Sequence, residues 1–232
     1  MAGGLWRAGA GGAGGSAADQ LGGVARPNPQ AALALGEAEG MTLGEAVRTP
    51  AFALMGCSIL LASAALTGVV PHMVLLALDR GFSKGDAAIT ASVYGLSTVL
   101  GRVVAGWLAD RFAVPRVAAA FFGLSMAGFA LAGVFGAVAG MPLLVFLSLM
   151  IGLGFGAESV VIARLIMRVF GHRAFGAIYG WLLGAFLVGA SIGAPLFGFG
   201  HDAFHSYGVA LFVAAGVMGG AVALMLILDR QS

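Results

Sequence analysis

The run PLLVFLSLMIGLGFGAESVVIARLIMR, residues 142–168, decides the fold class of this protein. Pro142 favours the first turn of a helix, and the only charged residue before Arg164 is Glu158. A helix needs about 20 predominantly apolar residues to cross the hydrocarbon core of a bilayer. The apolar residues do not alternate with polar ones, which excludes a strand of a membrane β-barrel. The run therefore predicts a transmembrane helix.

The composition of the whole chain also indicates a membrane protein. Of its 232 residues, 60% are hydrophobic and 9% are charged, whereas a soluble domain carries about 25% charged residues. Because so few charges cannot cover a water-facing surface, the apolar residues face lipid or each other. The formal net charge of +2 is too small to indicate a nucleic-acid partner. The single Cys57 excludes a disulfide framework.

Five more apolar runs flank the first one, so we predict an all-α membrane protein with six transmembrane helices. The predicted spans lie at about residues 50–78, 84–110, 115–138, 142–168, 173–200 and 207–228. Thr49-Pro50 places an N-cap and a first-turn proline before the first span, and Ser83 to Asp86 has capping-box spacing. Gly171 suits the position just after a helix end.

The chain divides into two regions. Residues 1–41 are rich in Gly and Ala, contain Pro27 and Pro29, and show no helical or alternating periodicity, so we expect a disordered tail. Residues 42–232 form the predicted six-helix domain. Basic residues predict its orientation, because they gather on the cytoplasmic side of membrane proteins. With both termini in the cytoplasm, the inner side receives Arg7, Arg26, Arg48, Arg111, Arg116, Arg168, Arg173 and Arg230. The outer loops receive only Arg80 and Lys84. From the six spans we expect a multi-pass protein of the plasma or inner membrane.

The segment GRVVAGWLADRF, residues 101–112, is the most informative motif. Arg111 follows a helix end and is expected to interact with its carbonyl groups, while Asp110 suits nearby cations or helix N-termini. Gly106 lies one turn before Asp110 and permits a close neighbour. On physical grounds alone, a charged helix end with a packing glycine is an alternative interpretation.

These residues carry a family resemblance. Gly106-x-x-x-Asp110-Arg111, followed by Arg116, resembles the loop signature of the major facilitator superfamily in its carboxy-terminal-half version. The run FGHRAFGAIYG, residues 170–180, is similar to the FG-x-R-x-FG-x-IYG run between helices 10 and 11 of that superfamily. The resemblance covers about residues 42–228 and is closest in look to monocarboxylate and oxalate/formate carriers. It implies that the six spans correspond to helices 7 to 12 of a twelve-helix carrier.

The sequence also departs from the family pattern. Related sequences often have an acidic residue and a tyrosine at the positions of Val160 and Arg164. The family's loop signature usually has a glycine near Val114, and here Pro115 intervenes. The lysine that oxalate carriers use on helix 11 has no counterpart in residues 179–200. This absence weakens the dicarboxylate interpretation.

Arg102 is the predicted substrate-binding residue. It lies eight positions before Asp110, about 12 Å deeper along the helix axis. A guanidinium inside the membrane costs at least about 2.5–3.5 kcal/mol, so it usually faces a cavity or a partner. In the resembled carriers an arginine at this position binds the substrate carboxylate, and its fork geometry suits that task. The alternative is a structural arginine that bonds to carbonyl groups or pairs with Glu158.

Glu158 and His72 are the candidates for proton coupling. A desolvated carboxyl such as Glu158 is suited to carry a proton, with a packing hydrogen bond or ion pair as the alternative. His72 follows Pro71 near the outer end of the first span and either lines the pathway or sits at the interface.

Three further patterns carry no function in this interpretation. Gly152-x-Gly154-x-Gly156 follows no strand and indicates helix packing rather than a dinucleotide loop. His201 and His205 are too few for a zinc site, so we expect no metal and no cofactor. The third pattern is small-residue spacing on the fifth span, at Gly176, Gly180 and Gly184 and again at Gly189 and Gly193, which marks a helix packed against protein.

The sequence therefore predicts a secondary transporter of small organic anions of the monocarboxylate type, and no enzyme, since no nucleophile set is present. Arg102 binds the anion, Glu158 or His72 takes part in proton coupling or exchange, and Gly106, Asp110, Arg111 and Arg116 form the gating loop motif. The alternative is a truncated or split half-transporter without transport activity alone, or a subunit that needs a second six-helix half from another copy or another chain.

Overall fold

The computed structural model describes residues 40–79, 81–135, 138, 140–204 and 207–231, so most of the predicted tail lies outside it. Within the described residues the chain is helical and has no strand beyond an isolated bridge between Gly40 and Gly171. The helices are α2 (Leu43–Ala46), α3 (Pro50–Asp79), α4 (Lys84–Ala109), α5 (Val114–Phe135), α6 (Met141–Val169), α7 (Phe175–Phe204) and α8 (Tyr207–Gln231). The helices α3 to α8 are the 6 that are long and apolar enough to cross a membrane, which confirms the predicted fold class.

Capping side chains open two of the long helices. The Thr49 hydroxyl accepts a hydrogen bond from the Phe52 N–H at 3.2 Å, and α3 begins between them at Pro50. Before α4, the Ser83 hydroxyl accepts from the Asp86 N–H at 3.2 Å, and the Asp86 carboxylate accepts from the Ser83 N–H at 3.1 Å. This reciprocal pair is a complete capping box. Local sequence therefore determines where these helices start.

Three helix starts differ by one or two residues from the sequence prediction, and one of them is α6, which begins at Met141 rather than Pro142. Helix α5 begins at Val114, one residue before Pro115, because proline is tolerated throughout the first turn, where its missing N–H has no helical partner. Helix α7 begins at Phe175 rather than Arg173, because the Phe175 N–H donates to the His172 carbonyl at 3.4 Å in a turn. Gly171 has a φ of +78° directly after the C-cap of α6, the left-handed conformation that favours glycine.

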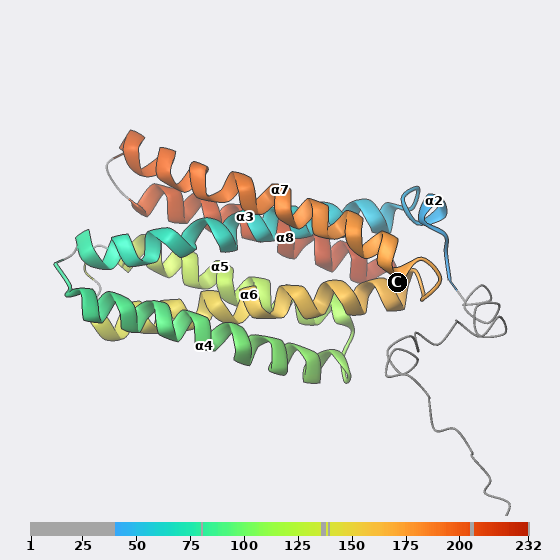
Figure 1. The fold of residues 1–232 in the computed structure, drawn as a ribbon, viewed down its shortest axis with the longest axis horizontal. Coiled ribbons are helices and arrows are strands. Elements are labelled where there is room, and N and C mark those ends of the chain that lie inside the picture. The colour runs from blue at the N-terminus through green and yellow to red at the C-terminus, as the bar shows by residue number, and fades with distance from the viewer. Residues whose placement is uncertain (1–39, 80, 136–137, 139, 205–206, 232) are drawn as a thin grey trace, which may run out of the picture. The chain divides into compact units, whose positions relative to one another are not determined.

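The long helices pack chiefly in three pairs, α4 with α6, α3 with α7 and α5 with α8 (Figure 1). Glycines allow the backbones to approach closely in the first two pairs. A Cβ added to Gly156 of α6 would lie 2.7 Å from the Thr98 carbonyl carbon of α4. One added to Gly193 of α7 would lie 3.0 Å from the Ala64 carbonyl carbon of α3. The carbonyl oxygens of Thr98 and Ala64 would lie closer still, at separations that real Cβ atoms essentially never show, so these positions require glycine.

One end of the bundle gathers the predicted inner-side segments. Helix α2, the α4–α5 connection, the α6–α7 connection and the C-terminal end of α8 all lie at this end in Figure 1. It carries the predicted inner-side arginines of the described residues: Arg48, Arg111, Arg116, Arg168, Arg173 and Arg230. The predicted orientation requires all of these arginines to lie at the same end of the bundle, and the fold meets this requirement.

The bundle core lies between the inward faces of α3, α5, α6 and α8, around Phe122, Phe129, Leu147 and Ile151. Helices α4 and α7 are the least buried of the six spans. Each leaves a long apolar face open. On α4 this open apolar face includes Leu96, Val99, Leu100, Val103 and Trp107, and on α7 it includes Trp181, Leu187, Val188, Ile192, Leu196 and Phe199.

Candidate functional site

An ion pair joins α4 to α6 at the end of the bundle that carries the inner-side arginines. Asp110 is the C-cap of α4, and its carboxylate accepts a hydrogen bond from the Arg164 guanidinium of α6. Gly106 faces the same arginine: a Cβ there would lie 3.8 Å from Arg164 Nη2, which is ordinary van der Waals contact. The sequence interpretation placed Gly106 and Asp110 in one motif but treated Arg164 as a departure from the family pattern. The structure gives Arg164 a partner from that motif.

The electrostatics of this pair follow from its geometry. The hydrogen bond from Arg164 holds the pKa of the Asp110 carboxyl below its usual range, and the charges of Arg164, Arg111 and Arg168 act in the same direction. Asp110 remains largely exposed, at 61% for its side chain, so the pair is weakened by solvent screening. The pair is therefore a partly exposed contact between the two helices and not a buried ion pair.

Arg111 folds back on its own helix. Its guanidinium carbon lies 3.8 Å from the centroid of the Trp107 ring, a cation–π contact, and its Nη1 donates to the Trp107 carbonyl at 3.4 Å. A cation at the carbonyl end of a helix also interacts favourably with the helix dipole. Arg111 thus terminates α4 and is not bound to α6.

Two further arginines lie at this end of the bundle. Arg168 of α6, which sequence reasoning used only to predict orientation, donates to the Ala109 carbonyl at 3.0 Å and to the Phe112 carbonyl at 3.5 Å. Its spacing of four residues from Arg164 places both on one face of α6, and this spacing was the available signal. Arg116, by contrast, donates through Nε to Asp229 of α8 at 2.7 Å. The structure therefore separates Arg116 from the rest of the predicted gating motif.

Arg102 has an exposed side chain on α4. Among the described residues it has neither a hydrogen bond nor an ion pair, although Arg164 and Arg168 further along the bundle both have partners. The structure therefore does not bring Arg102 to Glu158, and it does not show the carbonyl bonds of the structural alternative. An unpaired guanidinium on a membrane-crossing helix is a group suited to an anionic ligand.

Glu158 lies in the interior of the bundle on α6. Its side chain is 1% exposed, and neither carboxyl oxygen has a hydrogen-bond partner among the described residues. The Tyr94 hydroxyl on the adjoining α4 is likewise buried and without such a partner there. Sequence reasoning missed Tyr94, because a tyrosine in an apolar helix gives no signal of which neighbour it will meet. The hydrogen bond or ion pair proposed as the packing role of Glu158 is not observed.

His72 lies between three helices near the other end of the bundle. Its ring stacks on Phe197 of α7 with centroids 5.8 Å apart, and it is tilted against Tyr207 of α8 at 5.6 Å. Its Nε2 lies 3.4 Å from the Ala194 carbonyl oxygen, while Nδ1 is buried and has no hydrogen-bond partner in the described part of the chain. Since Nε2 can only donate to a carbonyl, the neutral ring would carry its proton there.

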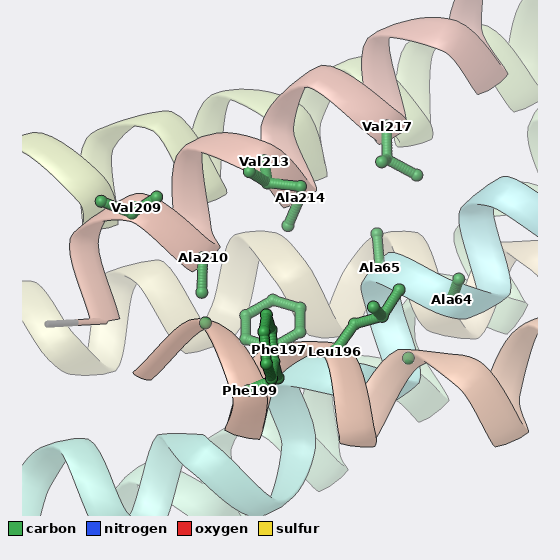
Figure 2. A pocket seen from close by; sticks show the side chains of 12 residues that line it. Ala64, Ala65, Leu196, Phe197, Phe199, Val209, Ala210, Val213, Ala214 and Val217 are labelled. Carbon is green, nitrogen blue, oxygen red and sulfur yellow. The ribbon is translucent and has the colours of Figure 1, made fainter. Parts of the chain in front are cut away.

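Two cavities beside α7 differ in chemistry from an anion site. One of about 220 Å³ lies between α3, α7 and α8, and Figure 2 shows Phe197 and Leu196 of α7 facing Ala210 and Ala214 of α8 across it. Its lining residues are Ala, Gly, Val, Leu and Phe, so it offers no side chain to a carboxylate. A second cavity, of about 640 Å³ beside α7, is lined by glycines and apolar residues with no charged side chain.

Comparisons with known proteins agree on one family. A family model described as Major Facilitator Superfamily matches residues 53–232. Monocarboxylate transporter 13 of Rattus norvegicus is 31% identical over 145 residues, covering 62% of this chain and 33% of that protein. Monocarboxylate transporter 10 of Danio rerio is 29% identical over 159 residues, covering 65% and 30%. The chain thus spans about a third of the length of these relatives.

A solved structure shares the fold. The crystal structure of a variant of the E. coli fucose:proton symporter matches with a TM-score of 0.67 at 19% identity, covering 80% of this chain and 44% of that chain. At this identity the match concerns the fold alone. It agrees with the sequence expectation that six helices correspond to half of a larger carrier.

Proposed function

Because this chain belongs to the Major Facilitator Superfamily, we propose that it transports small organic anions of the monocarboxylate class across the cell membrane. In alternating access, two six-helix halves rock about a binding site near the bilayer midplane. The six helices described here correspond to one half, and a second six-helix half completes the cavity. The monocarboxylate transporters of rat and zebrafish among its relatives support this choice of substrate class.

The observation that carries the proposal is the unpaired guanidinium of Arg102. It is exposed on a membrane-crossing helix and has no hydrogen bond or ion pair among the residues that the structure describes. A membrane-embedded arginine costs at least about 2.5–3.5 kcal/mol, so a ligand or a polar cavity is needed to offset this cost. The planar fork of arginine can hold both oxygens of one carboxylate, and charge-assisted bonds of this type are strong.

The remaining predicted site residues have roles in coupling and gating. Glu158 or His72 takes up and releases a proton as the carrier changes conformation, which gives symport with protons or exchange. Asp110, paired with Arg164, and Arg111, which terminates α4, hold the cytoplasmic end closed until the halves rock. The exposed Asp110–Arg164 pair suits this role, because breaking it costs little.

Uptake of radiolabelled lactate into proteoliposomes tests the binding role of Arg102. Arg102→Ala is expected to abolish uptake, and Arg102→Lys to retain part of it, since lysine keeps the charge but loses the bidentate geometry. Arg230→Ala is the matched control, because Arg230 is also an exposed arginine but lies at the C-terminal end of α8. Unchanged uptake in Arg102→Ala, with the purified variant eluting as a folded species, contradicts the role.

A second candidate function is a half-transporter that is inactive without its partner half. The open faces of α4 and α7 favour it, because Gly176, Gly180 and Gly184 of α7 have no atom within 4 Å of an added Cβ. Small residues of this kind allow another helix to approach closely. If the wild-type chain takes up no lactate and light scattering finds it monomeric in detergent, this function replaces the first one. Uptake by a dimer of the chain supports a self-sufficient carrier.

A further inference from the structure

The interior of the bundle contains two buried polar side chains that no protein group satisfies among the described residues. Glu158 is 1% exposed and Tyr94 is 9% exposed. Both carboxyl oxygens and the phenol oxygen lack a hydrogen-bond partner in that part of the chain. Leaving one buried polar group unsatisfied costs about 1–3 kcal/mol, and more when the group is charged. Two such groups in one region therefore indicate a site that binds something other than protein.

The two groups come from adjoining helices and share one region of the core. The Tyr94 ring of α4 is tilted against the Phe155 ring of α6 with centroids 6.1 Å apart, and Phe155 lies one helical turn before Glu158. Gly152 brings the two helices together here, since a Cβ on it would lie 2.7 Å from the Tyr94 carbonyl oxygen.

Other charged or titratable side chains on the neighbouring helices are engaged elsewhere or point away. Arg102 of α4 is exposed, and Arg116 of α5 bonds to Asp229. On α3, the His72 ring packs against α7 and α8, and Cys57 is exposed. Tyr179 of α7 stacks on Phe175 of its own helix. Among the side chains named here, Tyr94 is the buried titratable neighbour of Glu158.

We propose that Glu158 and Tyr94 form a buried proton-binding site in which Tyr94 is the positioning residue. The proton binds to a carboxylate oxygen of Glu158, which changes the side chain from a charge of −1 to neutral and removes the cost of a buried carboxylate. When the proton leaves, the Tyr94 hydroxyl donates to the carboxylate and partly stabilises the charge. For its role in transport this inference rests on the proposed function, and it selects Glu158 over His72 as the coupling residue.

Infrared difference spectroscopy of the full chain in lipid nanodiscs tests the site without substrate. The carbonyl stretch of a protonated carboxylic acid is followed as a function of pH. Glu158→Gln is expected to remove a band of this kind. Tyr94→Phe keeps the ring that contacts Phe155 but lacks the donor, so it should move the midpoint of that band upward by about one pH unit, a tenfold tighter proton. Tyr179→Phe is the matched control and should leave the band unchanged.

Three results would overturn the inference: no band assignable to Glu158 at any pH, a midpoint that Tyr94→Phe leaves in place, or an equal shift in Tyr179→Phe. Size-exclusion chromatography of each variant ensures that the spectra report folded protein. The infrared band does not depend on transport, so a failure of the proposed function can be distinguished from a failure of the proton-binding site. An intact, Tyr94-dependent band without lactate uptake refutes transport by the chain alone, whereas Arg102-dependent uptake without the band refutes only the proton site.

Discussion

Gly156→Ala is expected to force α4 and α6 apart. The added methyl carbon would lie 2.7 Å from the Thr98 carbonyl carbon and 2.9 Å from the Thr98 Cα, and it would collide with the Thr98 carbonyl oxygen. Optimal carbon–carbon separations are about 3.5–4.0 Å, so the helices must separate by roughly 1 Å at this point. The atoms in the way belong to backbone, which no rotamer change can move. Overpacking of this kind costs about 1–3 kcal/mol.

Gly180→Ala is the matched control within the same protein. Gly180 is also within a long helix, but an added Cβ there meets no atom within 4 Å. Both variants gain the same helix propensity, about 0.5–1 kcal/mol for alanine over glycine. The difference between them therefore isolates the cost of the α4–α6 contact, which corresponds to roughly 2–12 °C in melting temperature for a chain of this size.

The assay heats each purified variant in detergent and measures the monodisperse fraction by fluorescence-detected size-exclusion chromatography. Gly156→Ala should lose this fraction several degrees below Gly180→Ala, and Gly180→Ala should match or exceed the wild-type chain. Equal melting temperatures for the two alanine variants would refute the reasoning, since the backbones of α4 and α6 then do not approach as closely as the structure places them.

Two further predictions concern the cytoplasmic-end ion pairs. Because the pKa of Asp110 is lowered in the folded chain, its pair with Arg164 stabilises the fold above the carboxyl's unfolded pKa of about 4, and this contribution disappears as the pH falls through the lower folded value. We expect the melting temperature to fall less between pH 6 and pH 3, about the range that brackets the pKa of this carboxyl, in Arg164→Ala than in the wild-type chain. An equal fall in the two proteins would argue against the pair. The second pair joins Arg116 and Asp229, whose side chains are 71% and 13% exposed. A double-mutant cycle with Arg116→Ala and Asp229→Asn should give a coupling energy of about 0.2–1 kcal/mol. A much larger value would show that solvent does not screen the pair.

Local chemistry explains why much of the fold is readable from the sequence. A span needs only length and hydropathy, and a helix start needs only its own capping residues, such as Ser83 with Asp86. Both signals lie within a few residues of the feature they predict. The prediction of six membrane helices is confirmed for this reason, and the starts at Val114, Met141 and Phe175 differ from the prediction by only one or two residues.

The predicted site residues depend on contacts between distant segments, so the sequence described them only in part. Asp110 was selected for its place after a helix, but its partner Arg164 is 54 residues away and was treated as a departure from the family pattern. Arg116 was grouped with Asp110 on the resemblance to the family's loop signature, and the structure pairs it with Asp229, 113 residues away. The substrate-binding role of Arg102 stays a prediction that the uptake assay decides.

The sequence by itself determined that this protein lies in the membrane with six helices. Each apolar segment that is long enough to span the hydrocarbon core is stable there independently of the others. Only the tertiary structure decided which helix faces meet. The glycines of α7 illustrate this: Gly189 and Gly193 pack against α3, whereas Gly176 and Gly180, with the same spacing, face open space. Lipid and protein interior are equally apolar, so composition cannot distinguish a lipid-facing glycine from a packed one. Close packing and hydrogen-bond geometry distinguish them, and these arise only when the helices come together.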